Sequence, residues 1–404
     1  MRRILKGGQL LDLQREERRV VDLELDGPVI SKVADHIEAG PGDAVTNIDG
    51  CSLLPGMTNC HAHLGWDGVR DLEEQSIESD EITAWRCAMN VQRCIASGLT
   101  RIRDLGMNTG NMFAKKAVSL GLAPPLKVVP VARAITMTGG HTWWCCREAD
   151  GIEDCRRAVR EQVKDGAEWI KVMGNHHWPQ FPVGTPPVPQ FTEDELLTLV
   201  SEAHANGLKV TACVGYDAAI SRVVRAGVDC IEHGGSMSES TIEMMLERGT
   251  WLVTTFSPLV IQAERGLELG MPREAVEHRK WQLADGARFD GVRRAAAAGV
   301  PIAFGTDAGS PLVPHGEIVP ELKFMVQIGV CADNWAALRA ITSSPAKLLG
   351  AESGTGTIEP GKTADIVIVD GDPVRDLEEL RRVRAVLVEG AVAYGGGRGY
   401  SQVS

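Results

Sequence analysis

The sequence predicts a (β/α)8 barrel that carries one small β domain, and three observations support this fold class. The 404 residues are 44% hydrophobic and 24% charged, which suits a globular chain with a large core. Both ends of the chain contain short strand-like runs separated by Gly and Asp-Gly turns. The middle alternates apolar strand-like runs with helical stretches, which is the pattern of a parallel sheet covered by helices.

The two ends, residues 1–55 and 354–404, are expected to form the small β domain. The N-terminal strand-like runs lie at residues 3–5, 10–12, 20–25, 29–33 and 45–54. The C-terminal part contributes two more runs, at residues 364–370 and 383–389. Because the two ends share this short-strand texture, we expect them to pair in one sheet domain.

Residues 56–353 are expected to form the barrel. Eight strand-like runs occur there, at residues 58–63, 100–105, 126–135, 169–173, 209–214, 229–233, 251–255 and 301–305. Helices are expected between them, for example at residues 150–165, 193–206, 218–226 and 238–248. Thr192 and Glu195 have the spacing of a capping box at the start of one such helix. In this fold, polar residues at the C-terminal ends of the strands are the catalytic candidates.

The first barrel strand ends in the tripeptide His61-Ala62-His63. Side chains alternate along a strand, so both histidines point the same way. Neutral imidazole is the commonest metal ligand of proteins. The pair therefore predicts a site for Zn²⁺ or a similar ion.

Three further barrel strands carry, within or just after them, residues that could bind a metal ion. Lys171 lies inside the apolar fourth strand, where its amine either extends to the rim or has reacted with CO2 to become a carbamate that can bridge two metals. His233 ends the sixth strand, as a metal ligand or as a hydrogen-bonded rim residue. Asp307 follows the eighth strand, where it can bind metal and accept a proton, or cap the next helix.

Taken together in this strand order, the motifs resemble the amidohydrolase superfamily, in the branch of imidazolonepropionase-like and metal-dependent dipeptidase (prolidase-type) enzymes. The matching stretches are residues 53–64, 138–141, 170–172, 227–234, 305–309 and 354–370. The resemblance spans nearly the whole chain. It implies a (β/α)8 TIM barrel with a β-sandwich formed by both termini, one or two divalent ions per chain, usually zinc, and a homo-oligomer.

The resemblance also implies a role for each of these residues. His61 and His63 would bind the more buried metal, and carboxylated Lys171 would bridge it to a second one. His233 would bind the second, more exposed metal. Asp307 would bind the first metal and shuttle the proton.

One position departs from the family pattern. The histidine that the family has at the end of strand five is replaced here by Cys213. In one reading this cysteine is a thiolate ligand of zinc. In the preferred reading its presence leaves the second site weak or empty, which gives a one-metal enzyme. In a third reading it is an ordinary buried cysteine, and His176 or His177 fills the gap.

The expected chemistry is hydrolysis of a C–N bond. A metal-bound hydroxide attacks a carbonyl-type carbon, because the metal lowers the pKa of its water to about 7. Asp307 accepts the proton and returns it to the leaving nitrogen. His141 would lie near the carbonyl oxygen or a charged end of the substrate.

The substrate is expected to be a small, partly aromatic amide, urea or carbamate, because tryptophans cluster on the expected mouth loops. These tryptophans may instead pack the loops against one another. The residues expected near the substrate are His141, Trp66, Trp143, Trp144, His176, His177 and Trp178. No obvious arginine follows the site motifs to bind a carboxylate, although a distant one could reach the site.

Three other functions compete with this one. A dipeptidase or N-acyl amino acid hydrolase is the main alternative. A mononuclear-metal deaminase does not require the strand-four lysine, so a buried Lys171 argues against it. A non-catalytic scaffold has no physical need for His61, His63, His233 and Asp307.

The bulk properties exclude two classes of partner. The net charge is −12, and no basic stretch combines with aromatic residues, so nucleic-acid binding is not expected. No apolar run approaches the roughly 20 residues that a membrane span needs, and no apolar segment follows the charged N-terminus as in a signal peptide. A cytoplasmic protein is expected.

Overall fold

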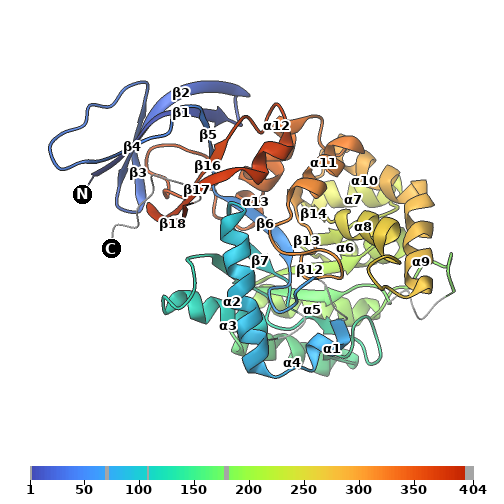
Figure 1. Ribbon diagram of the computed structural model, residues 1–404. Helices are drawn as coiled ribbons and strands as arrows, with labels where there is room; N and C mark the ends of the chain where they lie inside the picture. Colours follow the sequence, from blue (N-terminus) through green and yellow to red (C-terminus); the bar gives the residue numbers. More distant parts are fainter. Residues whose placement is uncertain (1, 69–71, 107–108, 177–181, 396–404) are drawn as a thin grey trace.

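The computed structural model describes residues 2–68, 72–106, 109–176 and 182–395 (Figure 1). An eight-stranded sheet is built from both ends of the chain, and Figure 1 shows the blue N-terminal strands beside the red C-terminal ones. Its strands are β1 (Arg2–Asp12), β2 (Glu17–Asp26), β3 (Val29–Ala34), β4 (Ala44–Asn47), β5 (Cys51–Pro55), β16 (Ile366–Asp370), β17 (Val383–Val388) and β18 (Ala391–Gly395). The antiparallel pair β5 and β16 joins the two ends.

Apolar side chains from β1, β2, β3, β5, β16 and β17 pack in one buried cluster, so residues far apart in sequence share a core. Two predicted strand boundaries differ from the structure. The runs at residues 3–5 and 10–12 belong to the single strand β1, whose pairing shifts register between Leu5 and Gly8, where Gly7 takes the positive φ of 76° that suits a glycine at a β-bulge. Residues 45–54 form two strands, because the chain turns at Asp49-Gly50.

In the described part of the chain, eight parallel strands correspond in order to the eight expected runs. They are β6 (Met57–Ala62), β7 (Leu99–Asp104), β8 (Lys127–Pro130), β11 (Trp169–Met173), β12 (Lys209–Val214), β13 (Cys230–His233), β14 (Trp251–Thr254) and β15 (Ile302–Phe304). Strands β6 to β8 pair in parallel, and so do β11 to β15. This alternation of parallel strands with helices confirms the predicted α/β fold class.

Backbone hydrogen bonds link the two groups of strands at both edges. Glu168 N donates to Pro130 O over 2.8 Å, and Asp307 N donates to His61 O over 2.9 Å. The expected strand at residues 126–135 ends at Pro130 and resumes as β9 (Ile135–Thr136). The interruption follows from Ala132, whose φ of 57° does not fit an extended strand.

Four helices lie where the sequence predicts them: α4 (Gly151–Lys164), α5 (Glu193–Ala205), α6 (Asp217–Ala226) and α7 (Glu239–Arg248). The capping box of Thr192 and Glu195 is confirmed. Apolar faces of these helices pack on strands β11 to β14 in one buried cluster.

The remaining helices complete the outer layer. They are α1 (Leu72–Ser76), α2 (Asp80–Ala96), α3 (Gly110–Ser119), α8 (Ser257–Arg265), α9 (Arg273–Ala284), α10 (Gly286–Ala298), α11 (Val319–Gln327), α12 (Asn334–Ile341), α13 (Ser343–Leu348) and the 3-10 helix η2 (Leu377–Arg381), and a short strand β10 (Arg147–Glu148) pairs with β9. Within the described ranges, no helix combines the length and the apolar character needed to cross a bilayer.

Candidate active site

The C-terminal ends of the parallel strands surround one cavity of about 180 Å³. His61 and His63 reach it from β6, Lys171 from β11, His233 from β13 and Asp307 from the loop after β15. Parallel strands bring their carboxyl ends to the same edge of a sheet, so residues separated by more than 200 positions meet here.

Two histidines and an aspartate form the tightest group in this cavity. The Nε2 atoms of His61 and His63 lie 3.3 and 3.2 Å from Asp307 Oδ1. The three ligand-type atoms all lie within 4.8 Å of one another. Both histidines are buried, and the Asp307 side chain is 17% exposed, so the group opens only toward the cavity. The two histidine side chains converge here because the single residue Ala62 separates them on the strand.

The hydrogen bonds of the two histidines decide which ring nitrogen carries a lone pair. His63 Nδ1 lies 3.1 Å from Gly106 O, and a carbonyl oxygen can only accept, so Nδ1 donates. Burial lowers the pKa of His63 to about 4, so the ring is neutral at pH 7 and its Nε2 is an acceptor. His61 Nδ1 lies 2.8 Å from a carboxylate oxygen of Glu232, which can only accept, so Nδ1 donates and Nε2 is directed toward Asp307.

The Nε2 atoms of both histidines therefore face the Asp307 carboxylate at the centre of this group. His61 Nε2 is buried and forms no hydrogen bond. Burial favours protonation of Asp307, but the contact with His61 holds its pKa well below the ordinary value, so the carboxylate is ionised. A carboxylate and the lone pair of the neutral His63 ring repel each other unless a cation lies between them. The three residues thus fit a divalent metal ion of the zinc type.

A buried ion pair between Arg103 and Glu232 holds the His61 ring in place. Glu232 and Arg103 are both 0% exposed, and their charged atoms lie 2.5 Å apart. Thr211 donates a further hydrogen bond to Glu232. Burial opposes ionisation, yet the charge of Arg103 and the hydrogen bonds from His61 and Thr211 lower the pKa of Glu232 to about 2. Sequence reasoning gave Arg103 and Glu232 no role, although a charged residue inside an apolar strand is the signal that could have found them.

Lys171 lies in the middle of β11 and is 2% exposed. Among the described residues, no side chain or carbonyl group forms a hydrogen bond or ion pair with its amine. A buried ammonium without an acceptor is costly. The predicted carbamate removes that positive charge and adds anionic oxygen atoms beside the metal group, so the environment of Lys171 fits carboxylation.

His233 and Cys213 are the remaining candidates for a second metal site. The His233 ring lies 4.7 Å from the His61 ring, and its Nδ1 lies 2.6 Å from the Thr255 hydroxyl. Cys213 Sγ contacts His141 Nδ1 at 3.9 Å, and burial raises the pKa of the Cys213 thiol to about 12. Within the described part of the chain, neither residue belongs to a group of three close ligand atoms.

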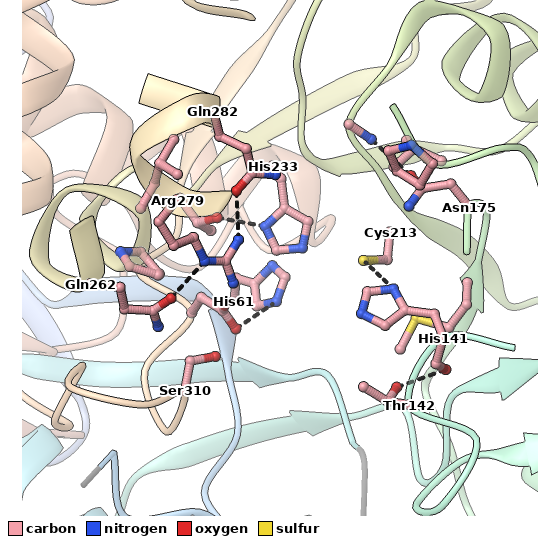
Figure 2. A pocket seen from close by; sticks show the side chains of 18 of the residues that line it. His61, His141, Thr142, Asn175, Cys213, His233, Gln262, Arg279, Gln282 and Ser310 are labelled. Atoms are coloured by element: carbon pink, nitrogen blue, oxygen red, sulfur yellow. Dashed lines mark hydrogen bonds and ion pairs between the residues drawn. The ribbon is translucent and has the colours of Figure 1, made fainter. Parts of the chain in front are cut away.

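Figure 2 shows His61, His233 and Arg279 on one side of the cavity and His141, Cys213 and Asn175 on the other. His141 and His176 both line the cavity. Asn175 accepts a hydrogen bond from Gly215 N over 3.0 Å, which ties the loop after β11 to the loop after β12. The cavity therefore lies between the group of His61, His63 and Asp307 and a wall of polar side chains.

The predicted tryptophans do not all reach the cavity. Trp66 lines it, with its ring 4.8 Å from that of His63. Trp144 packs against Trp66 at 6.1 Å and does not line the cavity, while Trp143 is 49% exposed, because the loop after His141 turns its side chain toward solvent. The predicted residues His177 and Trp178 lie outside the described residues.

Two arginines that the sequence motifs did not point to form part of the cavity wall. Arg279 comes from α9 and Arg288 from the first turn of α10. Arg279 donates from Nε to Gln262 and from Nη1 to Gln282, each over 2.8 Å, as Figure 2 shows. Their helices follow β14 at a distance in sequence from any strand-end motif, so only tertiary packing reveals them.

Comparisons with a family model, with solved structures and with curated proteins all find amidohydrolases or related hydrolases. The model for the amidohydrolase family matches residues 52–393. The structure of a prolidase complexed with N-methylphosphonate-L-proline is 29% identical, with a TM-score of 0.87 and coverage of 97% of this chain and 99% of that one. A Xaa-Pro dipeptidase with bound methionine in its active site is 27% identical, with a TM-score of 0.85 and coverage of 98% and 100%. The ochratoxinase of Aspergillus niger is 28% identical over 361 residues, which are 83% of this chain and 73% of that protein.

Proposed function

The chain belongs to the amidohydrolase family, and we propose that it is a metal-dependent hydrolase of a C–N bond in a small, partly aromatic amide, urea or carbamate. The observation that carries this proposal is the group of His61, His63 and Asp307, whose acceptor atoms converge on one point. The family and the similar prolidase, dipeptidase and ochratoxinase are hydrolases, which supports the same reaction class here.

His61, His63 and Asp307 would hold the first divalent ion, and carboxylated Lys171 would contribute an oxygen ligand. His233 would bind a second ion where one is present. When bound, zinc supplies a hydroxide nucleophile at neutral pH and polarises the carbonyl group under attack.

The residues of this chain provide the proton transfers. Asp307 is ionised, because His61 and His63 keep its pKa well below the ordinary value despite burial. Its carboxylate can accept the proton of the attacking water and deliver it to the leaving nitrogen. His141 lines the opposite side of the cavity and would orient the carbonyl oxygen or a charged end of the substrate.

A dipeptidase or N-acyl amino acid hydrolase is the second candidate. It is supported by the similarity to the prolidase and Xaa-Pro dipeptidase structures and by two arginines in the cavity wall. A deaminase is less well supported, because it does not need the buried Lys171. A non-catalytic scaffold leaves the convergent ligand atoms without a purpose.

The experiment is a hydrolysis screen with protein purified without chelators. Amides, ureas, carbamates, dipeptides and N-acyl amino acids are each incubated with the zinc-loaded enzyme, and both organic fragments are quantified together with ammonia. The proposal predicts two organic fragments in equal amounts from one of these classes. Ammonia without a second organic fragment would instead support a deaminase, and no turnover in the whole screen would support a scaffold.

A further inference from the structure

The turn that follows β6, residues 63–66, carries two side chains that line the cavity. His63 Nε2 lies 3.2 Å from Asp307 Oδ1, and the Trp66 ring lies 4.8 Å from the His63 ring. His63 and Trp66 are both buried, and both line the cavity. The position of this turn therefore determines where one candidate metal ligand and one part of the cavity wall lie.

The buried face of α2 holds the backbone of this turn. Asn90 Nδ2 donates to Leu64 O over 2.9 Å and to Trp66 O over 2.8 Å. Arg86 Nη1 donates to Gly65 O over 3.0 Å. A buried carbonyl group needs a donor, and a backbone ladder usually supplies it. Here the donors are side chains of a helix that begins more than ten residues later, so the turn takes its position from α2.

His315, in the loop after β15, donates to the same turn. Its Nε2 lies 3.1 Å from His63 O and 3.1 Å from Trp66 O. Carbonyl oxygens can only accept, so Nε2 carries the proton and shares it between the two carbonyl groups. Those two carbonyl groups belong to the two residues of the turn whose side chains line the cavity.

The loop that carries His315 also carries Asp307, and it contacts His63 along its whole length. His63 N donates to Ala308 O over 2.8 Å. Gly309 has a φ of 102°, and a Cβ atom there would lie 2.6 Å from His63 O, so the approach is close enough to require a glycine. The His63 ring faces Asp307 at one end of this loop, while its carbonyl group is held by His315 at the other.

We infer that Asn90 and His315 are positioning residues, which hold His63 opposite Asp307 and Trp66 against the His63 ring. This inference rests on the proposed function only for the role of His63 as a metal ligand, and not for the substrate or the reaction. Both side chains bond to backbone carbonyl groups, so they act on the metal site through the turn. Hydrogen bonds that orient a ligating histidine are worth about 10- to 100-fold in metal affinity.

The test removes each donor and then restores one. His315→Leu removes the donor of the β15 loop, whereas His315→Gln keeps an amide group that can donate to both carbonyl groups. Asn90→Leu removes the donor of α2. Gln162→Leu is the matched control, because Gln162 is a buried amide on α4 that bonds to Arg133 N and Ala158 O.

Two measurements on the folded proteins report on the metal site. Zinc affinity is measured by competition with a chromophoric chelator, and ligand geometry by the visible absorption of the cobalt-loaded protein. His315→Leu and Asn90→Leu should bind zinc about 10- to 100-fold more weakly than wild type and should change the cobalt absorption. His315→Gln should stay within about threefold of wild type, because the donor is restored. Gln162→Leu should melt at a lower temperature, because it loses buried hydrogen bonds, but should leave both metal measurements unchanged.

A purely structural role would give a different result. It lowers the melting temperature of the leucine variants but leaves the zinc affinity and cobalt absorption of the folded protein as in wild type, and that outcome would overturn the inference. Zinc binding by His315→Gln that is as weak as that of His315→Leu would also overturn it, because the loss would then follow from packing and not from the donor. If His315→Leu does not fold, Asn90→Leu gives the same decision.

The inference and the proposed function can fail separately. Weakened zinc binding by the leucine variants of a protein that hydrolyses none of the screened compounds would keep the inference and refute the proposed function. Zinc binding like that of wild type in the leucine variants of an active hydrolase would do the reverse.

Discussion

Glu232→Gln should weaken metal binding although Glu232 is not a metal ligand. One Glu232 oxygen accepts from Arg103 and Thr211, and the other accepts from His61 Nδ1. The glutamine oxygen will face the Arg103 guanidinium, because that cation cannot accept a hydrogen bond. The glutamine NH2 group then faces His61 Nδ1, which must become an acceptor. The ring proton then moves to Nε2, where it blocks the lone pair that a metal ion needs.

The magnitude follows from the contacts of Glu232. Its pKa of about 2, against an ordinary 4.5, means that the site stabilises the charged form by about 3 kcal/mol relative to the protonated form. Glutamine resembles the protonated form, and it leaves Arg103 buried without an anion. We therefore expect a loss of about 3 to 5 kcal/mol in the free energy of unfolding. Loss of the outer hydrogen bond to a ligating histidine should weaken zinc binding about 10- to 100-fold.

The assay uses urea unfolding of the metal-free protein and zinc competition with a chromophoric chelator. Glu321→Gln is the matched control, because Glu321 is also a wholly buried glutamate that accepts hydrogen bonds from Phe256 N and Ser257, and none from a histidine among the described residues. The control should bind zinc like wild type. Zinc affinity of Glu232→Gln within twofold of wild type would refute the tautomer argument.

Three further predictions can be tested in the same preparations. Asp307→Asn should lower kcat at least about 100-fold while zinc remains bound, because the proton acceptor is lost; turnover near the wild-type rate, measured alongside zinc content, would contradict the role of Asp307. Cys213→His should raise the zinc content toward two ions per chain if the second site is weak, whereas an unchanged content would mean that Cys213 is already a ligand or a bystander. Burial raises the pKa of Glu321 to about 7, so the folded chain holds its proton above pH 4.5 and the free energy of unfolding should fall as pH rises from 4.5 to 7. Glu321→Gln should remove this fall, which amounts to about 3 kcal/mol, so a stability difference between variant and wild type that is the same at pH 4.5 and pH 8 would count against it.

The strand pattern was the most predictable part of the structure. Strands β11 and β12 begin and end at the predicted residues, because each is a buried apolar run bounded by a turn. The strand expected at residues 126–135 could not be predicted correctly. Its interruption depends on the left-handed backbone of Ala132, a conformation that the side chain does not reveal.

The residues that line the cavity around His61 could be predicted for the same reason. His61, His63, His233 and Asp307 stand at or just after strand ends, and Lys171 lies two residues before the end of β11, so the parallel arrangement brings them to one edge of the sheet. Whether His233 and Cys213 bind a second ion depends on distances between side chains, which strand order does not determine.

The rest of the site depends on tertiary packing. Arg288 lines the cavity because the first turn of α10 lies beside it. No motif near Arg288 in the sequence indicates that this arginine belongs to the site. Trp143 shows the converse case. Its position beside His141 suggested a substrate contact, but the loop turns the ring toward solvent, where it is 49% exposed. Composition and spacing carry no information about such loop geometry.

The most direct test of the central claim is the zinc content per chain of protein purified without chelators, measured by elemental analysis for wild type and for a His61→Ala/His63→Ala double variant. The account predicts at least one ion per wild-type chain and a loss of at least one ion in the double variant, with catalytic activity lost in parallel. A wild-type chain without metal, or a double variant that keeps the full wild-type content, would contradict it.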